Sequence, residues 1–232
     1  SAAQLDPDAV AAQFADVAPT AWGLEVPGVV TNQPASGIAL TLDGCGGPSG
    51  SRVDHDLIDG LIARNVPATL FLNARWIDAN PDLAAQLAAN PLFELANHGT
   101  SHKPLSVTGE KAYGITGTAS SADAVAEVWT NHERLTALTG TPPRWFRSGT
   151  AHYDDVATQI VGALGERVAG FTINGDGGAT LSAAQVEREV LRAGPGDIVI
   201  AHLNQPDGDT AEGLLAAVDQ LLAGGATFVL LD

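Results

Sequence analysis

The residues most able to do chemistry in this sequence stand at the ends of hydrophobic segments. Five such segments end in a polar side chain: IALTLD at Asp43, FELANH at His98, PRWFR at Arg147, GFTIN at Asn174 and DIVIAH at His202. In a barrel of parallel strands, the carboxyl ends of the strands share one rim, and chemistry takes place there. We therefore expect an acid, imidazoles, a guanidinium and an amide to converge in one cleft, as in an enzyme.

A pair of histidines lies in NHGTSHKPL, directly after one of these segments. If the stretch is a helical turn, the four-residue spacing of His98 and His102 puts both imidazoles on one face, a familiar arrangement of metal ligands. Such pairs also occur by chance, on surfaces and in cores. The position after a strand, with Asn97 before the pair, favours a metal site.

Each of the other strand-end residues has a structural alternative. Asp43 could bind a metal or act as a general base, although taken alone it is better explained as the cap of its glycine-rich turn. His202 could be a general acid, a further ligand or a satisfied core histidine. Arg147 could orient a carboxylate or form a structural salt bridge.

Weaker candidates surround them. Asn174 and Asp176 in INGDGG fit substrate contacts, but a glycine-rich turn explains them equally well. Cys45 could be a zinc ligand, or a nucleophile if His202 lies beside it, but a small thiol that packs the turn is favoured.

Two further histidines depend on where their segments lie. His132 falls in the middle of a predicted helix, and we expect it at the surface. His152 lies in the loop after Arg147 and could line the cleft.

Strand and helix signals alternate from Gly37 onward. The strands are nearly continuous apolar stretches, as expected when both faces are buried, and the helices repeat apolar residues at intervals of three and four. This alternation predicts an α/β fold of parallel strands with outer helices, a βα-barrel lacking one unit. A doubly wound open sheet is the main alternative. The strands are expected at 38–43, 67–73, 93–98, 143–147, 168–174, 197–203 and 227–232, and the helices at 55–65, 81–90, 121–140, 153–165, 182–193 and 210–225.

Residues 1–36 differ from the rest and are interpreted as an N-terminal extension packed on a domain that covers 37–232. The stretch 6–18 predicts a short helix capped by Asp6 or Asp8. The stretch 22–37 is rich in Pro, Gly and Asn and predicts irregular structure.

Composition narrows the class of protein. A chain of 232 residues with 45% hydrophobic residues and a mean hydropathy of +0.09 is expected to form one packed domain, and we expect a monomer. The net charge of −16 argues against a nucleic-acid partner. No apolar stretch is long enough to span a membrane. The chain begins at Ser1 and contains no Met, so we expect processing, with a removed export signal and a secreted or cell-envelope location.

The ordered set of motifs resembles the polysaccharide deacetylases, the NodB-homology domain of carbohydrate esterase family four, over about residues 37–232. The histidine motif and the final motif are the most specific matches. The motifs that carry the resemblance are TLDG (41–44) for the family's TFDD, NHGTSH (97–102) for its HxxxH, FRSGT (146–150) for a strand followed by R-P-P-Y, TINGD (172–176) for its Asp-rich motif and IVIAH (198–202) for its L-x-H.

This resemblance implies a distorted (β/α)7 barrel and a metal-dependent removal of N- or O-acetyl groups from chitin oligomers, peptidoglycan, acetylated xylan or another saccharide. It implies one divalent ion, zinc first, with cobalt, manganese or nickel as alternatives. The implied roles are metal binding by His98 and His102, general base for Asp43, general acid for His202, orientation of Asp43 by Arg147 and an apolar contact for the acetyl methyl group by Ile200.

The sequence departs from the family's pattern at the metal. The second Asp of the motif, a third metal ligand, is replaced by Gly44, whereas catalytic zinc normally has three protein ligands. Asp43 could contact the metal, Cys45 could replace the missing ligand, or substrate and water could complete the shell. We favour Asp43.

A second departure concerns the loop after Arg147. Ser148, Gly149 and Thr150 stand where the family has two prolines and a tyrosine, and a backbone N–H of this loop could still stabilise an oxyanion. The lost aromatic residue leaves three candidates for stacking on a sugar: Trp76, Trp145 and Tyr153.

Two other functions compete with a metal-dependent deacetylase. The loss of the second Asp could leave a catalytically impaired barrel that binds carbohydrate. A hydrolase of other amides could use Cys45 as its nucleophile. The presence of Asp43, both histidines, Arg147 and His202 favours a metal-dependent enzyme.

Overall fold

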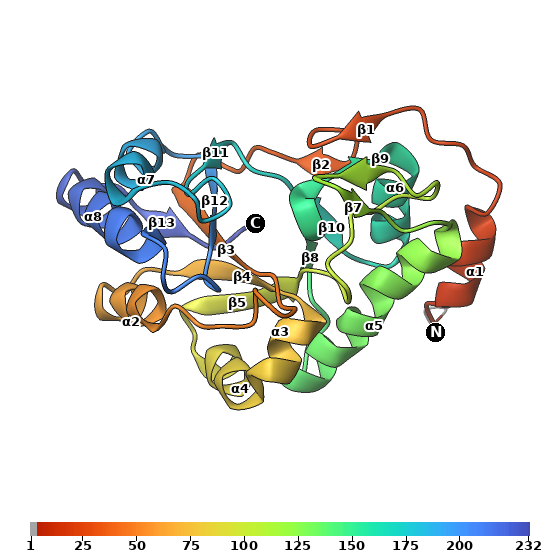
Figure 1. The fold of residues 1–232 in the computed structure, drawn as a ribbon, viewed down its shortest axis with the longest axis horizontal. Helices are drawn as coiled ribbons and strands as arrows, with labels where there is room; N and C mark the ends of the chain where they lie inside the picture. The colour runs from red at the N-terminus through yellow and green to blue at the C-terminus, as the bar shows by residue number, and fades with distance from the viewer. Residues whose placement is uncertain (1–3) are drawn as a thin grey trace. The chain divides into compact units, whose positions relative to one another are not determined.

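The computed structural model describes residues 4–232, which form two compact units (Figure 1). One unit combines residues 4–30 with Ala96–Gly170, and the other combines Thr31–Leu95 with Phe171–Asp232. They are called the first and the second unit below. The N-terminal segment thus groups with residues from the middle of the chain, and the predicted boundary at residue 36 stays a prediction. Within residues 4–232, no helix has the length and apolar character to cross a membrane.

The second unit is built around β3 (Ile38–Gly44), in which every residue is buried. This strand pairs in parallel with β12 (Ile198–His202), β4 (Ala68–Leu72) and β13 (Phe228–Val229), and β12 pairs with β11 (Ile173–Asn174). Parallel pairing buried on both faces explains why these strands are continuous apolar segments.

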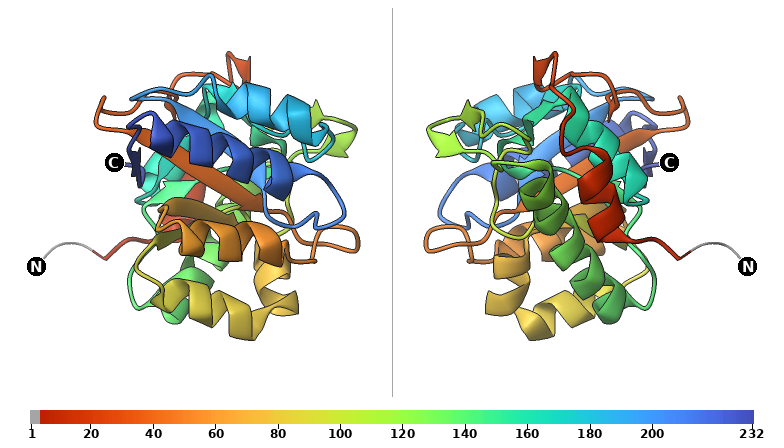
Figure 2. Two further views of the ribbon diagram at one scale, coloured as in Figure 1. Left: turned by 90° about the vertical axis from the view of Figure 1, so that its left-hand side faces the viewer. Right: turned by 90° about the vertical axis from the view of Figure 1, so that its right-hand side faces the viewer.

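Five helices accompany these strands in the second unit. The left-hand view of Figure 2 shows α8 packed between α7 and α2. Side chains fix where several of them begin: Asp54 accepts the N–H of Leu57, and Ser182 forms a capping box with Gln185. Four of the helices follow the prediction, and α3 was not predicted. The helices are α2 (His55–Ala63), α3 (Ala74–Ala79), α4 (Pro81–Ala89), α7 (Ala183–Val190) and α8 (Thr210–Ala223).

The first unit has its own parallel strands. β10 (Arg167–Ala169) pairs with β8 (Trp145–Phe146) on one side and β2 (Val29–Val30) on the other. Asn97, the last residue of β5 (Phe93–Asn97), pairs with Phe146. The carboxyl ends of β5 and β8 therefore lie together.

Two antiparallel pairs complete the strands of this unit. β1 (Trp22–Gly23), in the stretch that was expected to be irregular, pairs with β9 (Tyr153–Asp154). β9 takes the first two residues of the helix predicted at 153–165, which begins at Asp155 instead. A hairpin of β6 (Lys111–Ala112) and β7 (Ile115–Thr116) lies between the strand predicted at 93–98 and the helix predicted at 121–140, where no element was predicted.

The helices of the first unit enclose an apolar core. α1 (Pro7–Gln13) begins at Asp6, whose side chain accepts the N–H of Asp8 at 3.0 Å, as predicted. The right-hand view of Figure 2 shows α1 beside α5 (Ser121–Thr139) and α6 (Asp155–Ala163). Val10 and Phe14 are buried in the same apolar cluster as residues of α5 and α6, so the predicted extension contributes to the core of this unit.

The predicted strand over 168–174 is in fact two strands. The chain changes its hydrogen-bond partners at this point: the N–H of Gly170 is donated to Val30, at 2.7 Å, and the N–H of Thr172 to Ile198, at 2.9 Å. β10 thus belongs to the first unit and β11 to the second. A continuous apolar stretch could not reveal this change of partner.

Candidate active site

His98 is anchored by the backbone at the end of β8. Its side chain is 1% exposed, and Nδ1 donates to the carbonyl oxygen of Arg147 at 2.7 Å. The N–H of Arg147 is donated in turn to the carbonyl oxygen of Asn97 at 2.9 Å. Because a carbonyl can only accept, the proton of the neutral ring is on Nδ1, and Nε2 is the nitrogen suited to a metal. Metal-binding histidines usually have their other ring nitrogen held in this way.

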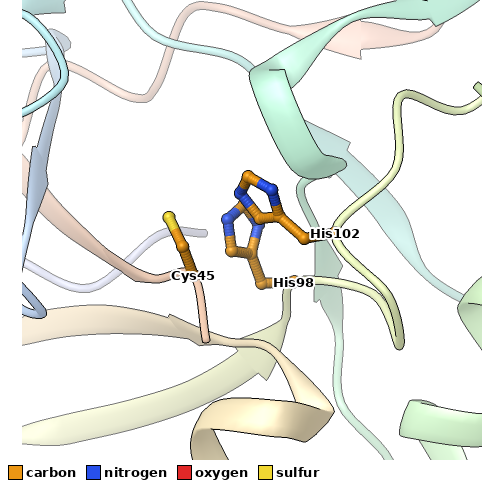
Figure 3. A group of neighbouring side chains, drawn as sticks. All are labelled: Cys45, His98 and His102. Atoms are coloured by element: carbon orange, nitrogen blue, oxygen red, sulfur yellow. The ribbon is translucent and has the colours of Figure 1, made fainter. Parts of the chain in front are cut away.

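His102 meets His98 through a loop rather than a helical turn. The two rings lie edge to face, with centroids 4.9 Å apart and planes at 81° (Figure 3). The backbone reaches this arrangement through positive φ angles at Gly99, +77°, and at His102 itself, +59°. The condition of a helical turn is therefore not met, although the two imidazoles do come together.

A carboxylate from α5 organises this loop. Glu127 is 5% exposed and accepts the backbone N–H groups of Thr100, Ser101 and Lys103 at 3.0 to 3.3 Å. A Cβ added at Gly99 would collide with the same carboxylate, so only glycine lets the loop pass so close. Burial raises the pKa of Glu127 and outweighs the opposing effect of these hydrogen bonds. Sequence reasoning missed this residue.

A second buried network lies next to the first. The side chain of Asn97 donates to Glu166 at 3.0 Å and accepts the N–H of Gly99 at 2.9 Å. Glu166 also contacts Nδ1 of His132 at 2.6 Å, and burial raises the pKa of this carboxyl. His132 is 7% exposed, so its predicted surface position is wrong. It lies on the inner face of α5, where it pairs with Glu166.

Arg147 is fully buried, and carbonyl groups satisfy part of its guanidinium. Nε donates to Ala169 at 3.2 Å, and one terminal nitrogen donates to Gly170 at 2.8 Å. A buried cation needs such partners. The proposed orientation of Asp43 by Arg147 stays a prediction.

The loop that follows Arg147 packs directly on the histidine loop. The N–H of Ser148 is donated to the hydroxyl of Tyr153 at 2.7 Å. A Cβ at Gly149 would collide with the backbone of His102. Thr150 has a φ of +71°, which is strained for a β-branched residue, and such strain often marks functional sites. Because the N–H of Ser148 is already used, an oxyanion donor in this loop would be Gly149 or Thr150.

In the second unit, Asp43 and His202 lie at matching positions on adjacent strands. They are Cα partners in the pairing of β3 with β12. Asp43 is 3% exposed, and the side chain of His202 is 17% exposed. Their placement at carboxyl ends of parallel strands follows the prediction.

Asp176 holds the imidazole of His202. Nδ1 of His202 lies 3.0 Å from one oxygen of this fully buried carboxylate, and the backbone N–H of His202 donates to the other at 2.8 Å. Thr210 donates to it as well, at 3.0 Å. Burial alone would lower the pKa of His202, but hydrogen bonds with Asp176 and Cys45 raise it well above its ordinary value. From the sequence, Asp176 could equally well be a turn residue or a residue of the functional site.

Gly44, which the resemblance aligns with the second Asp of the TFDD motif, has close apolar neighbours. A Cβ at this position would lie 3.2 to 3.3 Å from the side chains of Leu203, Leu72 and Trp76. The direction in which a side chain would leave Gly44 is therefore filled by apolar groups. Cys45 is partly exposed, and it contributes to the raised pKa of His202. Its role in packing the turn stays a prediction.

The remaining predicted residues have simpler surroundings. Asn174 is exposed, and its side chain closes the turn by accepting the N–H of Gly177 at 2.9 Å. Ile200 is 6% exposed on β12. The proposed stacking residues are wrong, because all three have no exposed surface and serve as core: Trp76, Trp145 and Tyr153.

The chain matches the family described as polysaccharide deacetylase over residues 31–169, more than half of its length. It belongs to the polysaccharide deacetylase family. A search of curated proteins finds no match.

Solved structures of this family share the fold. A carbohydrate esterase family 4 pseudoenzyme from Bacillus anthracis is 21% identical over 88% of this chain and 67% of its own, with a TM-score of 0.71. A peptidoglycan N-acetylglucosamine deacetylase is 21% identical over 88% of this chain and 91% of its own, with a TM-score of 0.72. A family 4 carbohydrate esterase from Streptomyces lividans, in complex with acetate, is 20% identical over 88% of this chain and 95% of its own, with a TM-score of 0.67. The predicted fold class, the distorted (β/α)7 barrel of polysaccharide deacetylases, is confirmed.

The histidine pair fits the divalent metal on which polysaccharide deacetylases depend. Imidazole nitrogens suit zinc, cobalt and nickel. The bond from Nδ1 of His98 to the carbonyl of Arg147 fixes the ring in the tautomer that metal binding requires. The first unit therefore offers two imidazole side chains that would suit a metal, and the ring of His98 is held in place.

Proposed function

We propose that this polysaccharide deacetylase is a metal-dependent hydrolase that removes N-acetyl groups from an oligo- or polysaccharide, such as chitin oligomers or the glycan of peptidoglycan. The observation that carries the proposal is the pairing of His202 with the buried carboxylate of Asp176. A proton donor needs an oriented imidazole. A protein that only held carbohydrate would have no chemical need for one.

In this proposal His98 and His102 hold one divalent ion, zinc first. Cys45 supplies the third ligand in this proposal, because a thiolate is a good donor for zinc. This choice differs from the sequence-based preference for Asp43. It leaves Asp43 to act as the base, and the apolar packing around Gly44 supports a ligand from elsewhere. When bound, the ion would polarise the acetyl carbonyl and make water more acidic.

The residues of the chain then divide the hydrolysis between them. Asp43 takes a proton from water as the water oxygen bonds to the acetyl carbon. The N–H of Gly149 or Thr150 stabilises the oxyanion that develops on the carbonyl oxygen. His202, held through Nδ1 by Asp176, gives the proton on Nε2 to the sugar nitrogen as the C–N bond breaks. The products are acetate and a sugar with a free amine.

Metal content and acetate release test this function together. We expect elemental analysis of the purified protein to find about one ion per chain. We expect release of acetate from N-acetylglucosamine oligomers to stop after chelation and to return on addition of Zn²⁺, Co²⁺ or Mn²⁺. Release that persists without metal would contradict the proposal and implicate Cys45 as a nucleophile, which iodoacetamide would then block.

A carbohydrate-binding barrel without turnover is the second candidate. Gly44 favours it, because the family's motif has a carboxylate at this position. One of the structural neighbours is itself described as a pseudoenzyme. A protein that binds N-acetylglucosamine oligomers but releases no acetate with any of the three metals would establish this candidate.

A further inference from the structure

Three aromatic side chains of the first unit form a group that the proposed chemistry does not use. Trp22 and His152 have ring centroids 5.9 Å apart with planes at 35°. Tyr113 meets His152 edge to face, with centroids 5.4 Å apart and planes at 90°. We call Trp22, Tyr113 and His152 the aromatic shelf.

The three side chains of the aromatic shelf are exposed to different degrees at the surface. Tyr113 is 81% exposed, and Trp22 and His152 are partly exposed. Tyr113 and Gly114 form the two-residue turn of the β6–β7 hairpin, with φ angles of +50° and +75°, as in a type I′ turn. Asparagine is the usual residue at the first of these positions, so an exposed tyrosine there is unfavourable for folding and solubility alone.

Polar groups accompany the rings. Nδ1 of His152 donates to the carbonyl of Thr150 at 2.7 Å, so that Nε2 of the neutral ring is a hydrogen-bond acceptor. A cavity of about 210 Å³ adjoins Trp22 and is lined by Pro19, Thr20, Ala21, Trp22, Glu110 and Asp154. Flat rings beside acceptor atoms suit the C–H face and the hydroxyl groups of a sugar.

The shelf borders the loop that carries the metal-binding histidines. His152 ends the short loop whose Gly149 packs on the backbone of His102. The carbonyl of His152 accepts the N–H of Leu105 at 3.1 Å, and β1 holds Trp22 opposite Asp154 of β9 (Figure 1). A sugar on the shelf would therefore lie beside the segment that carries His102.

We propose that the aromatic shelf is a saccharide subsite, which binds a sugar of the chain next to the one that loses its acetyl group. The inference rests on the proposed function and extends it, because a substrate of several sugars needs contacts beyond the reacting one. The burial of Trp76, Trp145 and Tyr153 leaves stacking to other rings. The net charge of −16 suits a neutral saccharide better than a polyanion.

Substitution at the tip of the hairpin tests the subsite without unfolding it. Tyr113→Asn removes the ring but supplies the residue that a type I′ turn prefers, and Tyr113→Phe keeps the ring. Leu222→Ala, at an exposed residue of α8 in the second unit, is the control. Binding of N-acetylglucosamine tetramer is measured by calorimetry in a His202→Ala background, and kcat/KM for tetramer and dimer is measured in the otherwise native chain.

We expect Tyr113→Asn to raise the Kd for the tetramer about 3- to 10-fold and to lower the tetramer-to-dimer ratio of kcat/KM by a similar factor. Tyr113→Phe should leave both quantities near their native values. An unchanged Kd in Tyr113→Asn, or an equal fall of kcat/KM for dimer and tetramer, would overturn the subsite. If the native chain releases no acetate, the proposed function fails by itself. In that case the Kd of Tyr113→Asn for the tetramer decides the subsite by itself: a raised Kd supports it and an unchanged Kd overturns it.

Discussion

The two units hold their reactive histidines by different means. In the first unit the loop of His98 and His102 is shaped by backbone groups: positive φ angles, a carbonyl bonded to Nδ1, and N–H groups gathered on Glu127. In the second unit His202 depends on one buried carboxylate, Asp176. A histidine pair fixed by its backbone suits a metal, which requires ligands at set positions. An imidazole paired with a carboxylate suits proton transfer. Substitutions of His98 and of His202 should therefore have separable effects.

The largest expected effect is that of His98→Ala. We expect this variant to lose both the metal and acetate release, because only two of the three proposed ligands remain, whereas catalytic zinc normally has three protein ligands. Metal content by elemental analysis and acetate release measure the two losses. His55→Ala is the matched control, since His55 is exposed at the start of α2. A His98→Ala protein that kept the metal would show that the ligands lie elsewhere.

His202→Ala should separate turnover from metal binding. We expect acetate release to fall by about 10²- to 10⁴-fold, the usual contribution of a positioned general acid, with the metal content unchanged. Steady-state kinetics with N-acetylglucosamine oligomers and elemental analysis check both parts. Nearly full activity would show that His202 is not the acid.

Glu127→Gln is the sharpest test of backbone organisation in the first unit. A neutral amide accepts the N–H groups of Thr100, Ser101 and Lys103 less strongly, so we expect metal affinity to fall about 10- to 100-fold, as for other residues that support metal ligands. Competition with a chelator measures the affinity. Glu133→Gln is the matched control, because Glu133 is exposed on the same helix. Equal affinities in the two variants would contradict the role of Glu127.

The smallest effect on function is expected from Gly44→Asp, which introduces the carboxylate that the resemblance implies at this position. The new side chain would be forced among Leu72, Leu203 and Trp76. We expect the free energy of unfolding to fall by about 1–3 kcal/mol, as for other overpacked sites, with no gain in metal affinity. Chemical denaturation and metal titration test this, with Gly44→Ala as the milder comparison. A tighter metal site in Gly44→Asp would mean that the backbone adapts to the family's ligand.

Prediction from the sequence succeeded for strands and for strand-end residues, because a local pattern of apolar residues determines both. The buried parallel strands follow from continuous apolar segments, and His98 and His202 were placed at strand ends for the same reason. The strand pattern says nothing of which helix carboxylates turn inward. Glu127 lies on the face of α5 that also carries Ala124 and Val128, a signal that was present but not used.

Other features depend on contacts distant in sequence. The sequence around Asp176 predicts a turn residue, and only the contact with His202, 26 positions away, shows its role as a partner of the imidazole. His132 became internal because Glu166, 34 positions away, provides its partner. The division of the strand predicted at 168–174 likewise depends on which neighbours accept its N–H groups.

The β6–β7 hairpin has a consequence for how this protein could change its preferences. Its two strands pair with each other, and Tyr113 and Gly114 close it by a turn of two residues. Its tip can therefore vary in length and side chain while the buried networks of Glu127 and Glu166 stay as they are. In a laboratory evolution experiment, a library centred on the exposed Tyr113 would vary the proposed subsite with little loss of folded protein.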